Sequence, residues 1–163
     1  LAAGKMAALL ARSASRDIFD CHALLSTPGL DSAKLRLGFV VYGGINRKDW
    51  RTVSAADVKA DANEMLMELV PMLRSDLRPR RGEIARWTDN LVAECRERLS
   101  VLLPFHEAEL EFLRRLNESG DISPELLTSD AAMHVTIRDH PGLKWKALNV
   151  RKHLGLPQGK ENT

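Results

Sequence analysis

The sequence predicts a mainly α fold, a multi-helix bundle with short connections. Apolar residues make up 44% of the 163 residues but aromatic residues only 5%, a composition that favours packed helices over a β-sandwich. Apolar residues also recur at intervals of three and four, as on one face of an amphipathic helix. A chain of this length is expected to form one domain with a substantial core. We place that single helical domain at residues 1–154 and a flexible tail at 155–163.

The first part of the chain contains three predicted helices. Two are expected at residues 1–10 and 15–25, and a Thr-Pro-Gly sequence ends the second. The stretch 32–42 contains β-branched residues typical of a strand, but no nearby segment offers it a strand partner. We therefore predict a helix there, ended by Gly43 and Gly44.

Trp50 lies in the basic loop 46–52, and two interpretations stay open. In one, Trp50 stacks on a nucleobase while Arg47, Lys48 and Arg51 hold phosphates. In the other, the ring packs back onto the bundle and the basic side chains are solvated. We expect the packed arrangement.

Further helices complete the predicted bundle. They are expected at residues 54–73, 83–103 and 105–117, from residue 123, and at residues 130–138 and 143–154. Ser54 and Asp57 stand in the positions of a capping box at the start of the first of these. Residues 83–103 form the clearest amphipathic pattern, with apolar and charged side chains on opposite faces.

Charged residues gather within the first two predicted helices: Lys5, Arg12, Arg16, Asp17 and Asp20. On a helix, Asp17 and Asp20 project from one face, and Arg16 and Asp20 are i, i+4 neighbours. The surrounding residues are mostly apolar, which is expected to leave the charges partly buried or lining an open groove, where charges usually serve a ligand. The alternative is an exposed Arg16–Asp20 ion pair beside a solvated Lys5.

The same residues resemble two motifs of a known family. Residues 5–12, KMAALLAR, and 16–20, RDIFD, resemble the third and fourth motifs of the nucleotidyltransferases of the AbiEii/AbiGii abortive-infection toxin family. Residues 139–150, DHPGLKWKALNV, are similar to the C-terminal helix of longer members. The resemblance implies a transferase that moves a nucleotide from a nucleoside triphosphate to an acceptor such as tRNA, in phage defence or toxin–antitoxin function with a cognate antitoxin.

The resemblance also implies roles for the charged residues. Lys5 is expected to bind phosphate, Asp17 to have the catalytic role of the fourth motif and Asp20 to be its partner. Arg12 and Arg16 are expected to bind substrate or to hold the carboxylates in position. In this chemistry, catalysis is mostly the placement of charge around the transferring phosphoryl group.

The family uses Mg²⁺ held by an N-terminal α/β domain with a Gly-Ser turn and an Asp-x-Asp pair. This chain contains neither feature. We therefore expect it to be the C-terminal helical domain of a two-domain nucleotidyltransferase, inactive as this part alone, with most Mg²⁺ ligands outside the chain.

A second class of function stays open, a non-catalytic helical module for RNA or antitoxin binding, in which the charged cluster is a structural ion network. Arg78, Arg80 and Arg81 belong to the most basic run, 74–86, and are candidates for gripping an RNA backbone. The alternative for this run is a solvated connection whose arginines pair with nearby carboxylates.

Other classes find little support in the composition. The net charge of +2 is too small to indicate a nucleic-acid partner by itself. Cys21 and Cys95 are expected to be reduced, and neither has a second ligand at metal spacing. No stretch has the length and apolar character of a membrane span or the pattern of a leader peptide, so we expect a cytoplasmic protein with no membrane partner.

Overall fold

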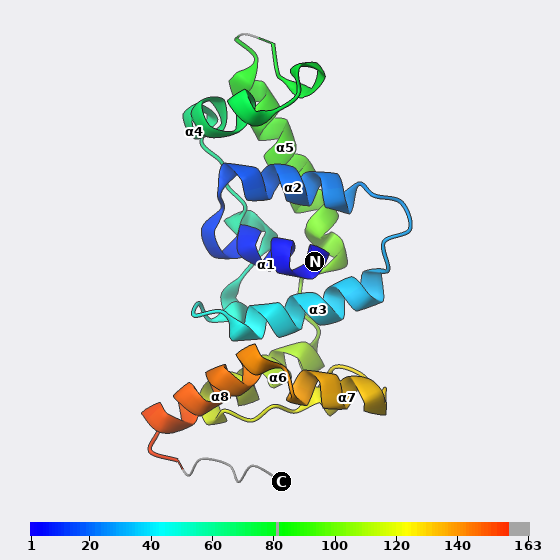
Figure 1. Cartoon of the computed structure of the whole chain (residues 1–163), viewed down its shortest axis with the longest axis vertical. Helices are drawn as coiled ribbons and strands as arrows, with labels where there is room; N and C mark the ends of the chain where they lie inside the picture. The colour runs from blue at the N-terminus through cyan, green and yellow to red at the C-terminus, as the bar shows by residue number, and fades with distance from the viewer. Residues whose placement is uncertain (81, 157–163) are drawn as a thin grey trace. The chain divides into compact units, whose positions relative to one another are not determined.

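The structure is a computed structural model that describes residues 1–80 and 82–156. Within these residues it contains eight α-helices, joined by loops and short 3-10 segments, and no strand (Figure 1). The predicted mainly helical fold is therefore confirmed. In the described part of the chain, no helix combines the length and the apolar character needed to cross a bilayer. The residues predicted as one domain fall into two compact units: unit 1 comprises Leu1–Phe39 and Val53–Pro104, and unit 2 comprises Val40–Thr52 and the described residues from Phe105 onward.

Unit 1 contains helices α1 (Ala2–Arg12), α2 (Ser15–Leu25), α4 (Ala62–Glu64) and α5 (Ile84–Arg98), together with the first part of α3 (Ser32–Ile45). Helix α2 packs against α1 on one side and against α5 on another (Figure 1). Apolar side chains from these helices, and from the turns that follow α4 and α5, are buried in its core, among them Met6, Leu9, Ile18, Cys21, Met65, Cys95 and Leu99.

The prediction of a continuous helix at 54–73 is wrong. The segment begins with the predicted capping box, but the helix that follows is a single 3-10 turn. At Val58 the backbone is extended, and its carbonyl accepts hydrogen bonds from Nε and Nη2 of Arg96 at 3.1 and 2.8 Å. Asp61 then caps the N-terminus of a second helical segment, which consists of α4 and a π-helical turn at Met65–Leu69. A distant arginine therefore satisfies a carbonyl that a continuous helix would have used internally.

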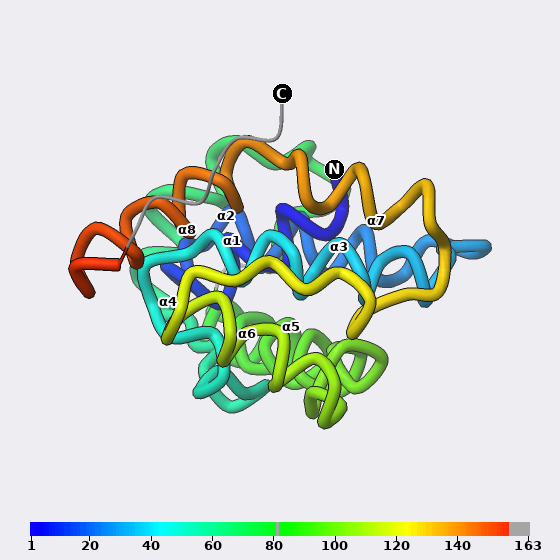
Figure 2. Tube along the Cα trace, turned by 90° about the horizontal axis from the view of Figure 1, so that it is seen from below, coloured from blue at the N-terminus to red at the C-terminus, as the bar shows by residue number. Residues whose placement is uncertain are grey.

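Unit 2 contains the second part of α3 and the helices α6 (Glu107–Ser119), α7 (Ala131–Arg138) and α8 (Pro141–His153), with a 3-10 turn at Pro124–Leu126. Helix α8 packs beside α6, and α7 leads directly into α8 (Figures 1 and 2). Its core includes the buried side chains of Trp50, Phe112, Leu113, Leu116, Ile137, Leu143 and Ala147.

Trp50 packs into unit 2, which confirms the expected arrangement and contradicts base stacking on this ring. Its side chain is 0% exposed. The indole lies directly against Gly43, where an added Cβ would meet Trp50 Nε1 at 1.9 Å. Helix α3 ends at Ile45, one residue beyond the Gly43–Gly44 pair that was predicted to end it. The glycine serves close packing rather than helix termination.

Candidate functional site

A tight turn brings the two predicted motifs together. Only Ser13 and Ala14 separate α1 from α2. Ser13 adopts the left-handed backbone conformation, with φ of 50°, and its amide donates to the carbonyl of Leu9 at 2.8 Å. The chain reverses direction at this point, so that α2 packs along α1. Side chains near the start of α1 therefore meet side chains in the middle of α2.

Lys5 and Asp20 form the accessible half of the charged cluster. Lys5 Nζ donates to Asp20 Oδ2 at 2.7 Å, and the two side chains are 35% and 34% exposed. This hydrogen bond is the main cause that raises the pKa of Lys5 above its ordinary value. Because an ammonium has three N–H donors, Lys5 can hold Asp20 and still donate to an anion from solvent.

Arg12 and Asp17 form the other half of the cluster, in which only the carboxylate is buried. Arg12 Nε and Nη2 donate to the two carboxylate oxygens of Asp17 at 2.6 and 3.1 Å, a forked pair. The Asp17 side chain is only 2% exposed, whereas that of Arg12 is 66% exposed. The hydrogen bond to Asp17 raises the pKa of Arg12. Asp17 also lies in the first turn of α2, where a negative charge is favoured. This pair ties the end of α1 to the start of α2.

The cluster therefore does not have the single open groove that the spacing predicted. Asp17 is buried and Asp20 is partly exposed, so the two carboxylates do not share one solvent-facing surface. The predicted i, i+4 partner of Asp20 was Arg16, but Asp20 pairs with Lys5, while Arg16 Nη2 lies 3.1 Å from Met72 Sδ on the exposed surface. The turn after α1 decides these partners, because it brings α1 within reach of α2.

The arginine run predicted to contact RNA is partly used for local structure. Arg78 donates to the carbonyls of Leu73 and Pro71 at 2.8 and 3.0 Å, and so closes its own loop. Arg80 is exposed. Arg81 lies outside the described residues. Arg78 is thus a loop-forming residue whose charge remains near the surface.

Arg51 has carboxylate partners within unit 2. It forms a forked pair with Asp49, and its Nη1 donates to Glu118 Oε1 at 2.6 Å. Glu118 also accepts from Arg114 at 3.1 Å. Of the three basic residues in this loop considered for phosphate binding, Arg51 is therefore neutralised by the protein itself.

The aspartates of the cluster do not fit a Mg²⁺ site as they are arranged. Both oxygens of Asp17 accept from Arg12, and Asp20 accepts from Lys5. In the part of the chain that the structure describes, no three His, Cys, Asp or Glu side chains are grouped to hold a metal ion. The two cysteines are free, as expected. Burial raises the pKa of Cys21 to about 12 and that of Cys95 to about 11, so both thiols are protonated near neutral pH.

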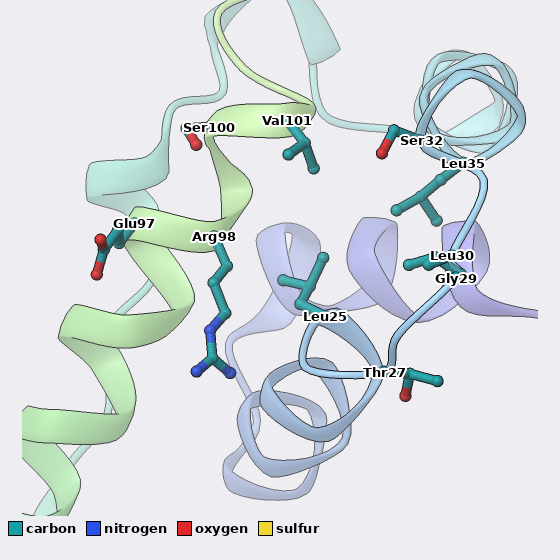
Figure 3. A pocket seen from close by; sticks show the side chains of 10 residues that line it. All are labelled: Leu25, Thr27, Gly29, Leu30, Ser32, Leu35, Glu97, Arg98, Ser100 and Val101. Carbon is teal, nitrogen blue, oxygen red and sulfur yellow. The ribbon is translucent and has the colours of Figure 1, made fainter.

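Unit 1 also contains a pocket that no sequence pattern indicated. Its volume is about 500 Å³, and residues from the end of α2, the start of α3 and the end of α5 line it (Figure 3). Its apolar wall is made by Leu25, Leu30, Leu35 and Val101. Arg98 is the cation at this pocket, but it donates to Glu94 at 3.0 Å and to the carbonyl of His22, and it also contacts the hydroxyl of Ser26. The hydrogen bonds of this guanidinium are therefore made within the protein.

A basic face on α8 is the second feature that sequence reasoning missed. The helix contains no carboxylate and four cations, Lys144, Lys146, Arg151 and Lys152. On the same helix the side chain of Trp145 is 55% exposed. The signal was present in the run KWKALNVRK, in which a tryptophan is flanked by lysines.

No family model, no curated protein and no solved structure matches this chain.

Proposed function

We propose that this chain is the helical portion of a nucleotidyltransferase of the AbiEii/AbiGii toxin type, and that Lys5 binds the phosphates of the nucleoside triphosphate. The observation that carries the proposal is the Lys5–Asp20 pair. Its 2.7 Å contact fixes the ammonium, while about a third of each side chain remains open to solvent. An ordinary ion pair on the surface would not need to lie between two helices whose other side chains are mostly apolar.

Each residue of the cluster has a separate role in this proposal. Asp20 orients Lys5, so that a fixed positive charge meets the phosphate oxygens. Arg12 and Asp17 are positioning residues that fix the angle between α1 and α2, in place of the catalytic role first expected for Asp17. Arg16, which lies on the exposed surface near Met72, is a second candidate for binding substrate.

The remaining parts of the reaction are assigned outside this chain. Mg²⁺ supplies charge neutralisation to the triphosphate when bound, and we place its ligands in an N-terminal domain, because the aspartates described here are already paired. The acceptor is tRNA or another RNA, and the proposed physiological setting is a cytoplasmic toxin–antitoxin or phage-defence system with a cognate antitoxin.

Label transfer tests the proposal. The gene product is incubated with Mg²⁺, labelled nucleoside triphosphates and total tRNA. We expect Lys5→Ala to lower transfer at least about tenfold, because it removes a fixed charge aimed at the phosphates. Lys5→Arg is expected to retain part of the activity. Lys34→Ala removes an exposed lysine of the same unit that pairs only locally with Asp31, and it serves as the matched control.

The assignment of Lys5 is contradicted if Lys5→Ala transfers label as well as the wild type. It is also contradicted if Lys34→Ala lowers transfer as much as Lys5→Ala does. Asp17→Asn separates structure from chemistry, because a positioning residue is expected to lower the thermal midpoint along with the activity. Loss of transfer in Asp17→Asn with an unchanged midpoint would return Asp17 to a catalytic role.

The second candidate function is a non-catalytic helical module that binds RNA or an antitoxin. One observation favours it: each of Lys5, Asp20, Arg12 and Asp17 already has a partner, so the cluster is complete without a ligand. The same assay distinguishes the two, since this candidate predicts no transfer by the wild-type gene product with any nucleoside triphosphate.

A further inference from the structure

Helix α8 presents one well-defined face to solvent. Leu143 and Ala147 point into unit 2 and are buried. Trp145, Leu148 and Lys152, at the spacing i, i+3 and i+7, share the opposite face. The side chains of Trp145 and Leu148 are 55% and 47% exposed. We call the surface formed by these three residues, with Lys144 at its edge, the α8 face.

Helix α8 contains an excess of positive charge, and Lys144 and Lys152 place part of it on the α8 face. Of the four cations on the helix, Lys144 is paired with a carboxylate, Asp139, at 2.8 Å. Lys146 and Arg151 donate to backbone carbonyls at 2.9 and 3.1 Å, which orients them without cancelling their charge. Lys152 is exposed. With no carboxylate on the helix itself, the surface attracts an anionic partner.

Helix stability explains only part of this charge. Cations in the last turn, such as Arg151 and Lys152, are favoured by the helix dipole. Lys144 lies in the first turn, where the dipole disfavours a positive charge, and Asp139 compensates part of that cost. The dipole therefore accounts for Arg151 and Lys152 but not for Lys144 and Lys146.

We propose that the α8 face binds a single-stranded nucleic acid, with one base stacked on Trp145 and the backbone phosphates held by Lys144 and Lys152. A basic groove or face with exposed aromatic rings is the usual way in which proteins hold single strands. The proposal concerns unit 2 and does not depend on nucleotide transfer by Lys5 in unit 1.

The observations favour a nucleic acid over a protein partner. The centre of a protein interface is apolar and poor in charged residues, whereas the exposed large apolar side chains within α8 are Trp145 and Leu148, with lysines beside them. A membrane-surface helix needs a continuous apolar face. On this face of α8, the charged Lys152 follows Trp145 and Leu148 and ends the apolar surface. A single strand needs only spaced cations and one stacking ring, and the α8 face provides both.

Fluorescence anisotropy with labelled 12-nucleotide strands tests the proposal, using RNA, DNA of the same sequence, and the DNA duplex, with no nucleoside triphosphate present. We expect Trp145→Ala to weaken binding of a single strand about tenfold, because it removes the stacked ring. Trp145→Leu keeps the apolar bulk and is expected to bind as weakly as Trp145→Ala. Trp145→Phe keeps an aromatic face and is expected to retain most of the affinity.

The lysines are tested by salt dependence. Lys144→Ala/Lys152→Ala removes two phosphate contacts and is expected to reduce the slope of log K against log salt by about 1.4. Lys34→Ala/Lys59→Ala removes the same charge from exposed positions in unit 1 and is expected to leave the slope unchanged. Equal affinity for RNA and DNA supports recognition through backbone and base stacking, and a preference for RNA supports an added contact to the 2′-hydroxyl.

Three results would overturn the proposal. They are the failure of both single strands to bind, duplex binding as tight as single-strand binding, and wild-type affinity in Trp145→Leu. The last result would identify the α8 face as an apolar contact instead of a stacking surface. Circular dichroism of each variant verifies that its helices are intact, which is expected because all the substituted side chains are exposed.

Discussion

Replacing Gly43 by alanine is expected to lower the free energy of unfolding by roughly 3 kcal/mol. The new Cβ would lie 1.9 Å from Nε1 and 2.0 Å from Cδ1 of Trp50, far inside van der Waals contact. Neither side yields easily, because Gly43 belongs to helix α3 and the Trp50 ring is fully buried. Urea unfolding followed by circular dichroism gives the difference.

A double-mutant cycle shows whether the ring is the cause. Trp50→Ala alone is expected to cost about 3–5 kcal/mol, as for other buried aromatic residues. In that background Gly43→Ala no longer meets the indole, and alanine gains up to about 1 kcal/mol over glycine inside a helix. The effect of Gly43→Ala is therefore expected to change sign. A similar loss in both backgrounds would mean that Trp50 is not the neighbour that excludes a side chain at Gly43.

Gly120→Ala is expected to be the second large effect, with a loss of roughly 2–3 kcal/mol. Gly120 ends α6 in the left-handed conformation, with φ of 63°. An added Cβ would also lie 2.6 Å from the carbonyl oxygen of Ala147 on α8. Because the obstacle is backbone, relief requires that α8 move away from α6. Urea unfolding measures this loss as well.

Gly29→Ala is the matched control for this position. Gly29 has φ of 78°, but an added Cβ there would meet nothing within 4 Å. Only the conformational cost applies, about 1 kcal/mol. If Gly29→Ala and Gly120→Ala lose the same stability, the close approach of α8 to Gly120 contributes nothing and the packing of α8 described above is incorrect.

Sequence patterns predicted the helices whose stability is local. The apolar stripe in 83–103 and the helix at 15–25 follow from spacing and from turn residues, and the structure contains both as α5 and α2. The segment 54–73 could not be predicted in this way. It breaks at Val58, where Arg96, 38 residues further along the chain, donates to the Val58 carbonyl. No local pattern contains that partner.

In the candidate site, too, local patterns were predictable and long-range contacts were not. The residues of the charged cluster were identified from the sequence, but their partners were not. Helical spacing paired Arg16 with Asp20, whereas Lys5 reaches Asp20 across 15 residues. That contact depends on the left-handed turn at Ser13, a conformation that serine seldom adopts and that the sequence did not indicate.

The most direct measurement of the central proposal is the response of Lys5 itself to a triphosphate. In ¹H–¹³C spectra of the folded chain, the ε-methylene signal of each lysine reports on its ammonium, and Lys5→Arg assigns the signal of Lys5. On titration with a nucleoside triphosphate and Mg²⁺, the Lys5 signal is expected to shift with saturation while that of Lys34 stays in place. A Lys5 signal that does not move, or that moves no more than that of Lys34, would contradict phosphate binding at the Lys5–Asp20 pair.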